Sequence, residues 1–175
     1  VAPTRDELAA ATGRTIADVI APGLEILFVG INPGLWSGAT GFHFARPGNR
    51  FWKAIHLAGL TDRVLDPSEQ EALLRSGIGI TNLVPRTTAT AAELTRAELR
   101  AGGRALVAKV EDLRPRQLAF LGISTYRVAF DAPIVGIGLQ PDRLAGALVW
   151  VLPNPSGLNA SWTLARLAEA YAALH

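Results

Sequence analysis

The sequence predicts a three-layer α/β/α fold with a mostly parallel central sheet of about four strands. Four short runs are nearly continuous in apolar character and rich in β-branched or aromatic residues, which is typical of strands that are buried on both faces. Segments with helical patterns lie between these runs, and strands that alternate with helices favour parallel crossover connections. The four runs are residues 25–31, 78–84, 117–122 and 148–152.

Five segments between and after these runs have the pattern of helices. They cover residues 50–58, 67–76, 95–113, 125–130 and 161–174. We find neither an internal repeat nor a low-complexity linker, and 175 residues is an ordinary length for one domain. We therefore expect a single domain over residues 1–175, in which residues 1–20 form an N-terminal helical extension.

The composition excludes several kinds of chemistry. The chain has no cysteine, which excludes disulfides, a thiol nucleophile and a metal or iron–sulfur centre held by cysteines. We expect neither a metal nor a cofactor.

No apolar stretch approaches the ~18 residues of a membrane span, and no secretory signal is recognisable, so we expect a cytoplasmic protein. Because the sequence contains no methionine, we also expect it to be part of a longer chain.

Arginine supplies 15 of the 17 basic residues, at a net charge of only +2. The planar guanidinium suits phosphate groups, but a GC-rich genome raises the arginine count without any functional cause. The total therefore leaves both interpretations open, and only the positions of the arginines can separate them.

Polar, turn-forming loops follow three of the four predicted strands, at the sheet edge where ligands of open α/β sheets bind. The first loop is Gly30-Ile31-Asn32-Pro33-Gly34. Glycine and proline favour a sharp turn, and the carbonyl oxygen of the Asn32 amide can orient a water molecule. Taken alone, this motif is more often just a turn.

The last predicted strand is followed by the sequence PNPSGLN, residues 153–159. Its prolines stiffen the loop, and glycine permits close approach of another backbone. Leu158 is an apolar residue in this polar context. It either packs into the core beneath the loop or acts as a wedge that enters a base stack, as apolar side chains do in DNA-bending proteins.

The two loops together resemble the family of mismatch-specific uracil-DNA glycosylases and thymine-DNA glycosylases. The resemblance extends in order through ILFVGINPGL, TGFHFARPGNRFWKAIHLAGLTDR, GITNLVPRTT, ELTRAELRAGGR and WVLPNPSGLN. It covers most of the chain from about Ala21 onward, and several of these strings are specific enough to make chance agreement very improbable.

The resemblance implies a role for individual residues. Asn32 would position the attacking water, and Phe44 would stack on the flipped pyrimidine. The polar edge of the flipped base would be bound by five further residues or the backbone beside them. These are Ile31, Gly34, Ser37, His43 and Asn154. Contacts with the DNA helix would come from Ser156, Gly157, Leu158 and Asn159, with Leu158 as the wedge, and Arg50 would meet a phosphate. Because a protein of near-neutral charge needs arginines at phosphates to hold DNA, we expect Arg86 to make such a contact as well.

Glu93 has two interpretations. It precedes a long predicted helix, where a carboxylate is favoured by the helix dipole and by capping. Alternatively, it reaches the water held by Asn32 and acts as the general base that an amide cannot be, a role typically worth ~10²–10⁴-fold in rate.

The resemblance implies a monofunctional glycosylase that flips uracil out of a G:U mismatch in double-stranded DNA and hydrolyses its glycosidic bond. Both lysines fall in predicted helices, so no lysine is evident for Schiff-base chemistry. We expect a monomer. A damage-binding protein without turnover is the alternative from another class. A nucleotide-cofactor domain is disfavoured, because the first strand is not followed by Gly-x-Gly-x-x-Gly or by a Walker lysine.

Overall fold

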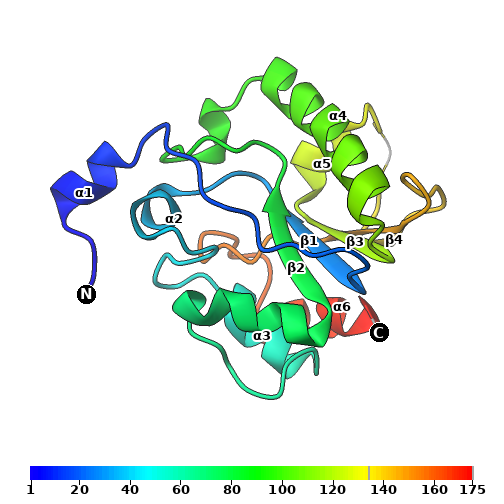
Figure 1. Ribbon diagram of the computed structural model, residues 1–175, viewed down its shortest axis with the longest axis horizontal. Helices are drawn as coiled ribbons and strands as arrows, with labels where there is room; N and C mark the ends of the chain where they lie inside the picture. The colour runs from blue at the N-terminus through cyan, green and yellow to red at the C-terminus, as the bar shows by residue number, and fades with distance from the viewer. Residues whose placement is uncertain (134, 175) are drawn as a thin grey trace.

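The computed structural model describes residues 1–133 and 135–174. It contains one five-stranded sheet, which lies between the helices in Figure 1. The strands are β1 (Ile26–Gly30), β2 (Ile78–Asn82), β3 (Gln117–Leu121), β4 (Gly138–Leu139) and β5 (Leu148–Leu152). Their spatial order is β2-β1-β3-β5-β4. All neighbouring pairs are parallel except β4 with β5. The predicted α/β class with a mostly parallel sheet is confirmed, with one strand more than expected.

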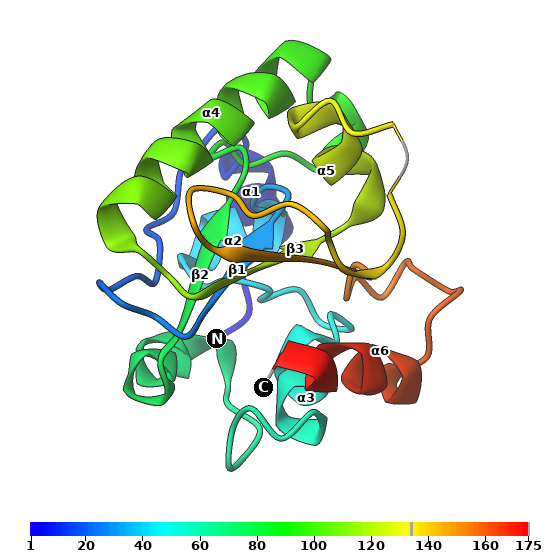
Figure 2. The same ribbon diagram turned by 90° about the vertical axis from the view of Figure 1, so that its right-hand side faces the viewer.

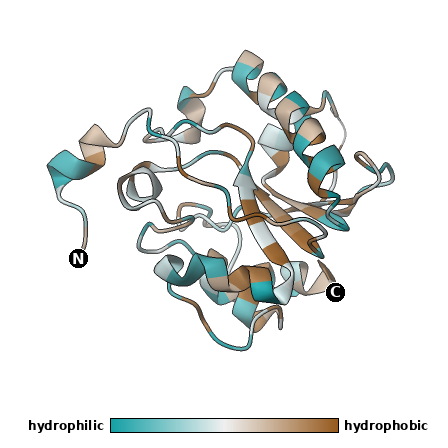
Figure 3. Cartoon of the chain, in the orientation of Figure 1, coloured by the Kyte–Doolittle hydropathy of each residue, from teal (hydrophilic) through white to brown (hydrophobic). Residues whose placement is uncertain are grey.

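Helices cover both faces of this sheet, which gives the three layers (Figure 2). The helices α4 (Arg96–Leu113) and α5 (Ile123–Ala129) lie on one face. The helices α3 (Phe51–Leu57) and α6 (Leu164–Tyr171) lie on the other face and contact each other. In Figure 3 the strands are coloured mostly as hydrophobic, whereas the helices that cover them carry hydrophilic residues as well.

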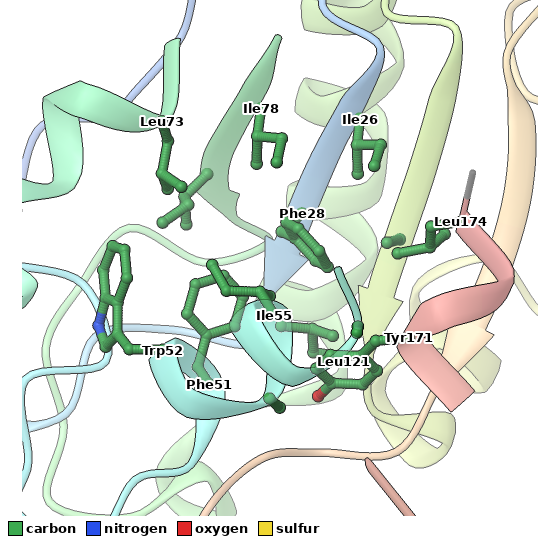
Figure 4. Close-up of a cluster of buried hydrophobic side chains, with 14 of the residues drawn as sticks. Ile26, Phe28, Phe51, Trp52, Ile55, Leu73, Ile78, Leu121, Tyr171 and Leu174 are labelled. Atoms are coloured by element: carbon green, nitrogen blue, oxygen red, sulfur yellow. The ribbon is translucent and has the colours of Figure 1, made fainter. Parts of the chain in front are cut away.

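Residues of β1 alternate between the two cores, as side chains of a strand must. Ile26 and Phe28 pack with α3 and α6 in one core, in which Phe28 lies among Phe51, Ile55 and Tyr171 (Figure 4). Leu27 and Val29 pack with α4 in the other core. Both faces are apolar, and this explains why the strand reads as a continuous apolar run instead of an alternating one.

Several short elements differ from the prediction. The helix α2 (Leu35–Thr40) was not expected, because six residues with a glycine among them show no period; it ends at Gly41 in the left-handed conformation. The two-residue strand β4 is too short to leave a pattern. The segment η1 (Pro67–Ser76) forms 3-10 helix and is capped by Asp66. Two further 3-10 turns are η2 (Ala91–Glu93) and η3 (Ala172–Leu174).

Within the expected N-terminal extension, the helix α1 (Arg5–Ala10) contains no buried residue and lies beside α2 (Figure 1). The chain after it is attached to the loop that follows β2. There the Gly13 N–H donates to the Thr87 carbonyl at 2.9 Å, and the Thr87 N–H donates to the Arg14 carbonyl at 2.9 Å. Within residues 1–133 and 135–174, no helix is both long and apolar enough to cross a membrane.

Candidate active site

A cavity of about 630 Å³ opens at the carboxyl ends of the parallel strands. It is lined by the segment 30–37 after β1, the segment 88–91 after β2, three residues of the loop after β5, and Phe44, Arg46 and Asn49 from the connection between α2 and α3. Leu8 of α1 and Leu121 at the end of β3 complete the lining. The predicted convergence of loops at this edge is thus present in the structure.

Asn32 lies in this cavity with a fixed amide orientation. Its Nδ2 group donates to the Arg86 carbonyl at 3.0 Å, to the Thr88 hydroxyl at 2.7 Å and to the Pro33 carbonyl at 3.2 Å. The Thr88 hydroxyl in turn donates its own hydrogen to the Thr90 carbonyl at 2.7 Å. Since carbonyl oxygens only accept, the nitrogen must face this loop. Oδ1, which accepts no hydrogen bond from the residues described, remains for a group in the cavity.

The ring of Phe44 forms an aromatic wall. It stacks on the ring of Phe51 with centroids 4.1 Å apart and planes at 24°, and Phe51 is fully buried on α3. The Phe44 backbone has a φ of 52°, in the left-handed region that bulky residues rarely adopt. Conformations of this kind are held in place by their surroundings and cluster at functional sites. Phe44 therefore offers a ring that is supported by Phe51.

The residues expected at the base edge fall into two groups. Ile31, Gly34, Ser37 and Asn154 all line the cavity. The Asn154 Oδ1 atom accepts from the Ser156 N–H at 2.9 Å. The backbone carbonyl of Asn154 accepts from the side-chain Nδ2 group of Asn159 at 2.9 Å. This leaves the Nδ2 group of Asn154 as a hydrogen-bond donor without an acceptor among residues 1–133 and 135–174.

His43 is the exception, and its expected contact with the base is corrected. Its side chain is 2% exposed and does not line the cavity. Burial lowers the pKa of the imidazole, and the neutral ring donates from Nε2 to the Ala17 carbonyl at 2.8 Å. The His43 main chain is bound by Gln70 and Trp52. His43 thus fixes the backbone next to Phe44 and lies outside the lining of the cavity.

The two arginines expected at phosphates are both partly buried and bound to other parts of the protein, so their contact with phosphates stays a prediction. The Arg50 guanidinium donates to four backbone carbonyls of the loop after β5. The Arg86 guanidinium forms a two-pronged ion pair with Glu98, and it also donates to the Glu93 carbonyl at 3.1 Å. The hydrogen bond from Arg86, followed by one from the Thr95 N–H, lowers the pKa of Glu98 to about 2. Arg86 therefore anchors the loop whose carbonyl holds Asn32.

Glu93 is exposed and does not line the cavity. Its carboxylate accepts from the Thr90 N–H at 2.7 Å and completes a capping box at the start of η2. These contacts favour the capping interpretation. The general-base role stays a prediction.

The loop after β5 presents Leu158 to solvent. Its side chain is 75% exposed, so the alternative of a core residue beneath the loop is excluded. Leu158 borders the main cavity and also a neighbouring hollow of about 430 Å³ on the other side. Gly157 lies against the Gly48 carbonyl, where an added Cβ atom would come within 2.7 Å of the oxygen. The sequence Ser156-Gly157-Leu158-Asn159 thus forms a tight, protruding turn at the rim.

Several lining residues were missed by the sequence analysis, and three of them matter for the argument, namely Thr88, Arg46 and Leu8. Thr88 holds the Asn32 amide, and only its position in a polar loop could have indicated this. Arg46 is exposed at the rim, and no hydrogen bond or ion pair of its guanidinium occurs within the described part of the chain. Nothing in the sequence around Leu8 indicates that it lies at the cavity.

Among the described residues, no group of three or more histidine, aspartate or glutamate side chains could hold a metal ion.

The sequence model of the Uracil DNA glycosylase superfamily matches residues 17–175, which leaves only α1 and its connection outside the match. The matched region includes every cavity residue except Leu8. The three-layer fold and, apart from Leu8, the cavity at the carboxyl ends of its strands both lie within the matched region. The chain therefore belongs to the uracil DNA glycosylase superfamily and is a DNA glycosylase of base excision repair.

Proposed function

We propose that this glycosylase is of the mismatch-specific type and removes uracil opposite guanine from duplex DNA. One observation carries the proposal: a single cavity joins an asparagine with a free carbonyl oxygen, a supported aromatic ring and an exposed leucine at its rim. An enzyme that acts on a base must take it out of the stack and read it in a pocket. Leu158, Phe44 and Asn32 are suited to opening the stack, holding the base and delivering water, respectively.

The pyrimidine would stack on the ring of Phe44. Its polar edge would meet the free Asn154 amide donor and the backbone around Ile31 and Ser37. Gly34 lines the cavity without a side chain, and the space beside it is open, because nothing lies within 4 Å of the position that a Cβ atom would take. We propose that this space tolerates a substituent on the ring, so that some related pyrimidines are also removed.

The chemical step is a hydrolysis. The bond from C1′ to the base nitrogen breaks with its electron pair on the departing uracil anion, and water then adds to the sugar cation and loses a proton. Aimed donors that stabilise the leaving anion make such a step possible without a strong base. Asn32 Oδ1 would hold the water. No lysine lines the cavity, so a Schiff base to the sugar is not part of the proposal.

Substrate preference tests the mismatch-specific type. We expect single-turnover excision to be faster for uracil opposite guanine than for uracil opposite adenine in the same flanking sequence. Gly157 and Ser156 would face the unpaired guanine through their backbone. Equal rates for the two duplexes would contradict the mismatch preference while leaving the glycosylase activity intact.

The position of Arg46 predicts a contact with a DNA phosphate. Each phosphate that a protein neutralises contributes about −0.9 to the slope of log K against log salt concentration. We expect Arg46→Ala to make the slope for duplex binding less steep by about that amount. Arg75→Ala removes an exposed arginine of η1 and serves as the matched control, with the parental slope. If both variants show the parental slope, Arg46 does not meet a phosphate.

Glu93→Gln separates the two roles of Glu93. Glutamine can replace glutamate at this position of a capping box, so the contacts of the structure predict a single-turnover rate within about threefold of the parent at neutral pH. The thermal midpoint of unfolding should hardly change. A loss of tenfold or more, together with loss of the acidic limb of the pH–rate profile, would instead establish Glu93 as the general base.

A further inference from the structure

Arg50 immediately precedes α3 and binds a loop that lies more than a hundred residues later in the sequence. Its Nη2 group donates to the Ser156 carbonyl at 2.7 Å and to the Asn159 carbonyl at 3.0 Å. Its Nε group donates to the Pro155 carbonyl at 3.4 Å, and Nη1 donates to the Trp162 carbonyl. Four of the five N–H groups of the guanidinium thus hold one loop.

The backbone reinforces this attachment. The Arg50 N–H donates to the Pro155 carbonyl at 3.0 Å. Gly157 packs so closely on the Gly48 carbonyl that a methyl group would not fit. The segment 48–50 and the loop 155–159 are therefore joined by side-chain bonds, a main-chain bond and direct packing.

Leu158 depends on this attachment because it has no packing of its own. Three quarters of its side chain are exposed, and its N–H donates to the Ser156 hydroxyl at 3.2 Å, within the loop itself. A wedge must stay in place against the stacked bases, which resist insertion. A loop that could bend would be pushed aside instead of opening the stack.

From this network we infer that Arg50 is a positioning residue that fixes the wedge Leu158 relative to the base pocket; this inference rests on the proposed function. The next residue, Phe51, is the support on which Phe44 stacks. One end of α3 thus supports both the base pocket and the wedge loop. The start of the loop is held separately, by the Tyr171 hydroxyl, which donates to the Pro153 carbonyl at 2.8 Å; Phe51 and Tyr171 lie together in one core (Figure 4).

A double-mutant cycle tests the inference. Single-turnover excision is measured for the parent, Arg50→Ala, Leu158→Ala and the double variant, on a duplex with uracil opposite guanine and on a single strand with the same uracil. We expect Arg50→Ala to slow excision from the duplex by at least tenfold and from the single strand by less than threefold. In the Leu158→Ala background, loss of Arg50 should cost less than a further twofold, because coupled residues are not additive.

The salt dependence of duplex binding separates positioning from a phosphate contact. If Arg50 only positions the loop, Arg50→Ala keeps the parental slope of log K against log salt concentration. A slope that becomes less steep by about 0.9 would place its guanidinium at a phosphate and overturn the inference. Equal losses on duplex and single strand, or full additivity with Leu158→Ala, would overturn it as well.

Two further variants keep the test valid if Arg50→Ala does not fold. Arg50→Lys retains the charge but lacks the planar fork that reaches several carbonyls. Gly157→Ala leaves Arg50 in place and displaces the loop from Gly48. Both should slow excision from the duplex more than from the single strand, and the opposite order would contradict the inference. A parent protein without activity on either substrate would refute the proposed function itself.

Discussion

Asn32→Ala is expected to lower the single-turnover rate of uracil excision by roughly 10²–10³-fold, the range found when one preorganised polar group of an active site is removed. Asn32 is held by the Arg86 carbonyl and the Thr88 hydroxyl, and its Oδ1 atom is the part left to hold water. Alanine removes that oxygen and leaves the water without a fixed position. The rate on uracil opposite guanine, at enzyme in excess, gives the size of the effect.

Binding and a second variant provide the controls for Asn32. Duplex affinity should stay within about threefold of the parent, since Asn32 lies in the cavity and carries no charge that could attract a phosphate. Thr88→Val removes the hydroxyl that accepts from the Asn32 amide and should have a smaller effect of the same kind, because two other acceptors remain. A nearly full rate for Asn32→Ala would show that this residue only shapes the turn after β1.

Leu158→Ala is expected to slow excision from a stable duplex by about tenfold to a hundredfold. Unstacking a base costs a few kcal/mol, and each 1.4 kcal/mol changes a rate or equilibrium by about tenfold. Because a wedge helps only where the stack resists, excision from a single strand or from a poorly stacked mismatch should fall much less. The ratio of the duplex rate to the single-strand rate is the quantity to compare with the parent.

The stability of Leu158→Ala distinguishes the wedge from a packing residue. A side chain that is 75% exposed contributes little to the core, so the thermal midpoint should stay within about 1 °C of the parent, in line with the small effects of most surface substitutions. Equal losses on all substrates, together with a clearly lower midpoint, would mean that Leu158 supports the loop by packing.

The strands of this fold could be predicted because their residues are apolar on both faces. Ile26 and Leu27 belong to different cores, and each is buried. Such a run is typical of a strand in a covered parallel sheet, and its short length favours a strand over a buried helix. The helix α2 and the strand β4 could not be predicted in the same way: two to six residues show no period, and both are fixed by neighbours distant in sequence.

The site could be predicted only in part, because sequence shows which groups are present and not which partners they find. Asn32 and Leu158 were identified from loop motifs and Phe44 from the family resemblance, and the structure places all three at one cavity. Arg50 is separated by 105 to 112 residues from the carbonyls that it binds. The deep burial of His43 likewise depends on Ala17 and Gln70, which no local pattern connects to it.

The role of the cavity is tested most directly by one measurement on a duplex that carries a single labelled uracil opposite guanine. Parent and Asn32→Ala are incubated with this duplex in excess enzyme, free uracil is quantified, and the DNA is cleaved at abasic sites with alkali. We predict that the parent releases uracil and leaves an equal amount of alkali-sensitive sites, with no strand cleavage before alkali, and that Asn32→Ala is slower by roughly 10²–10³-fold. Binding without release of uracil by the parent, or equal rates for both proteins, would contradict hydrolysis at this cavity.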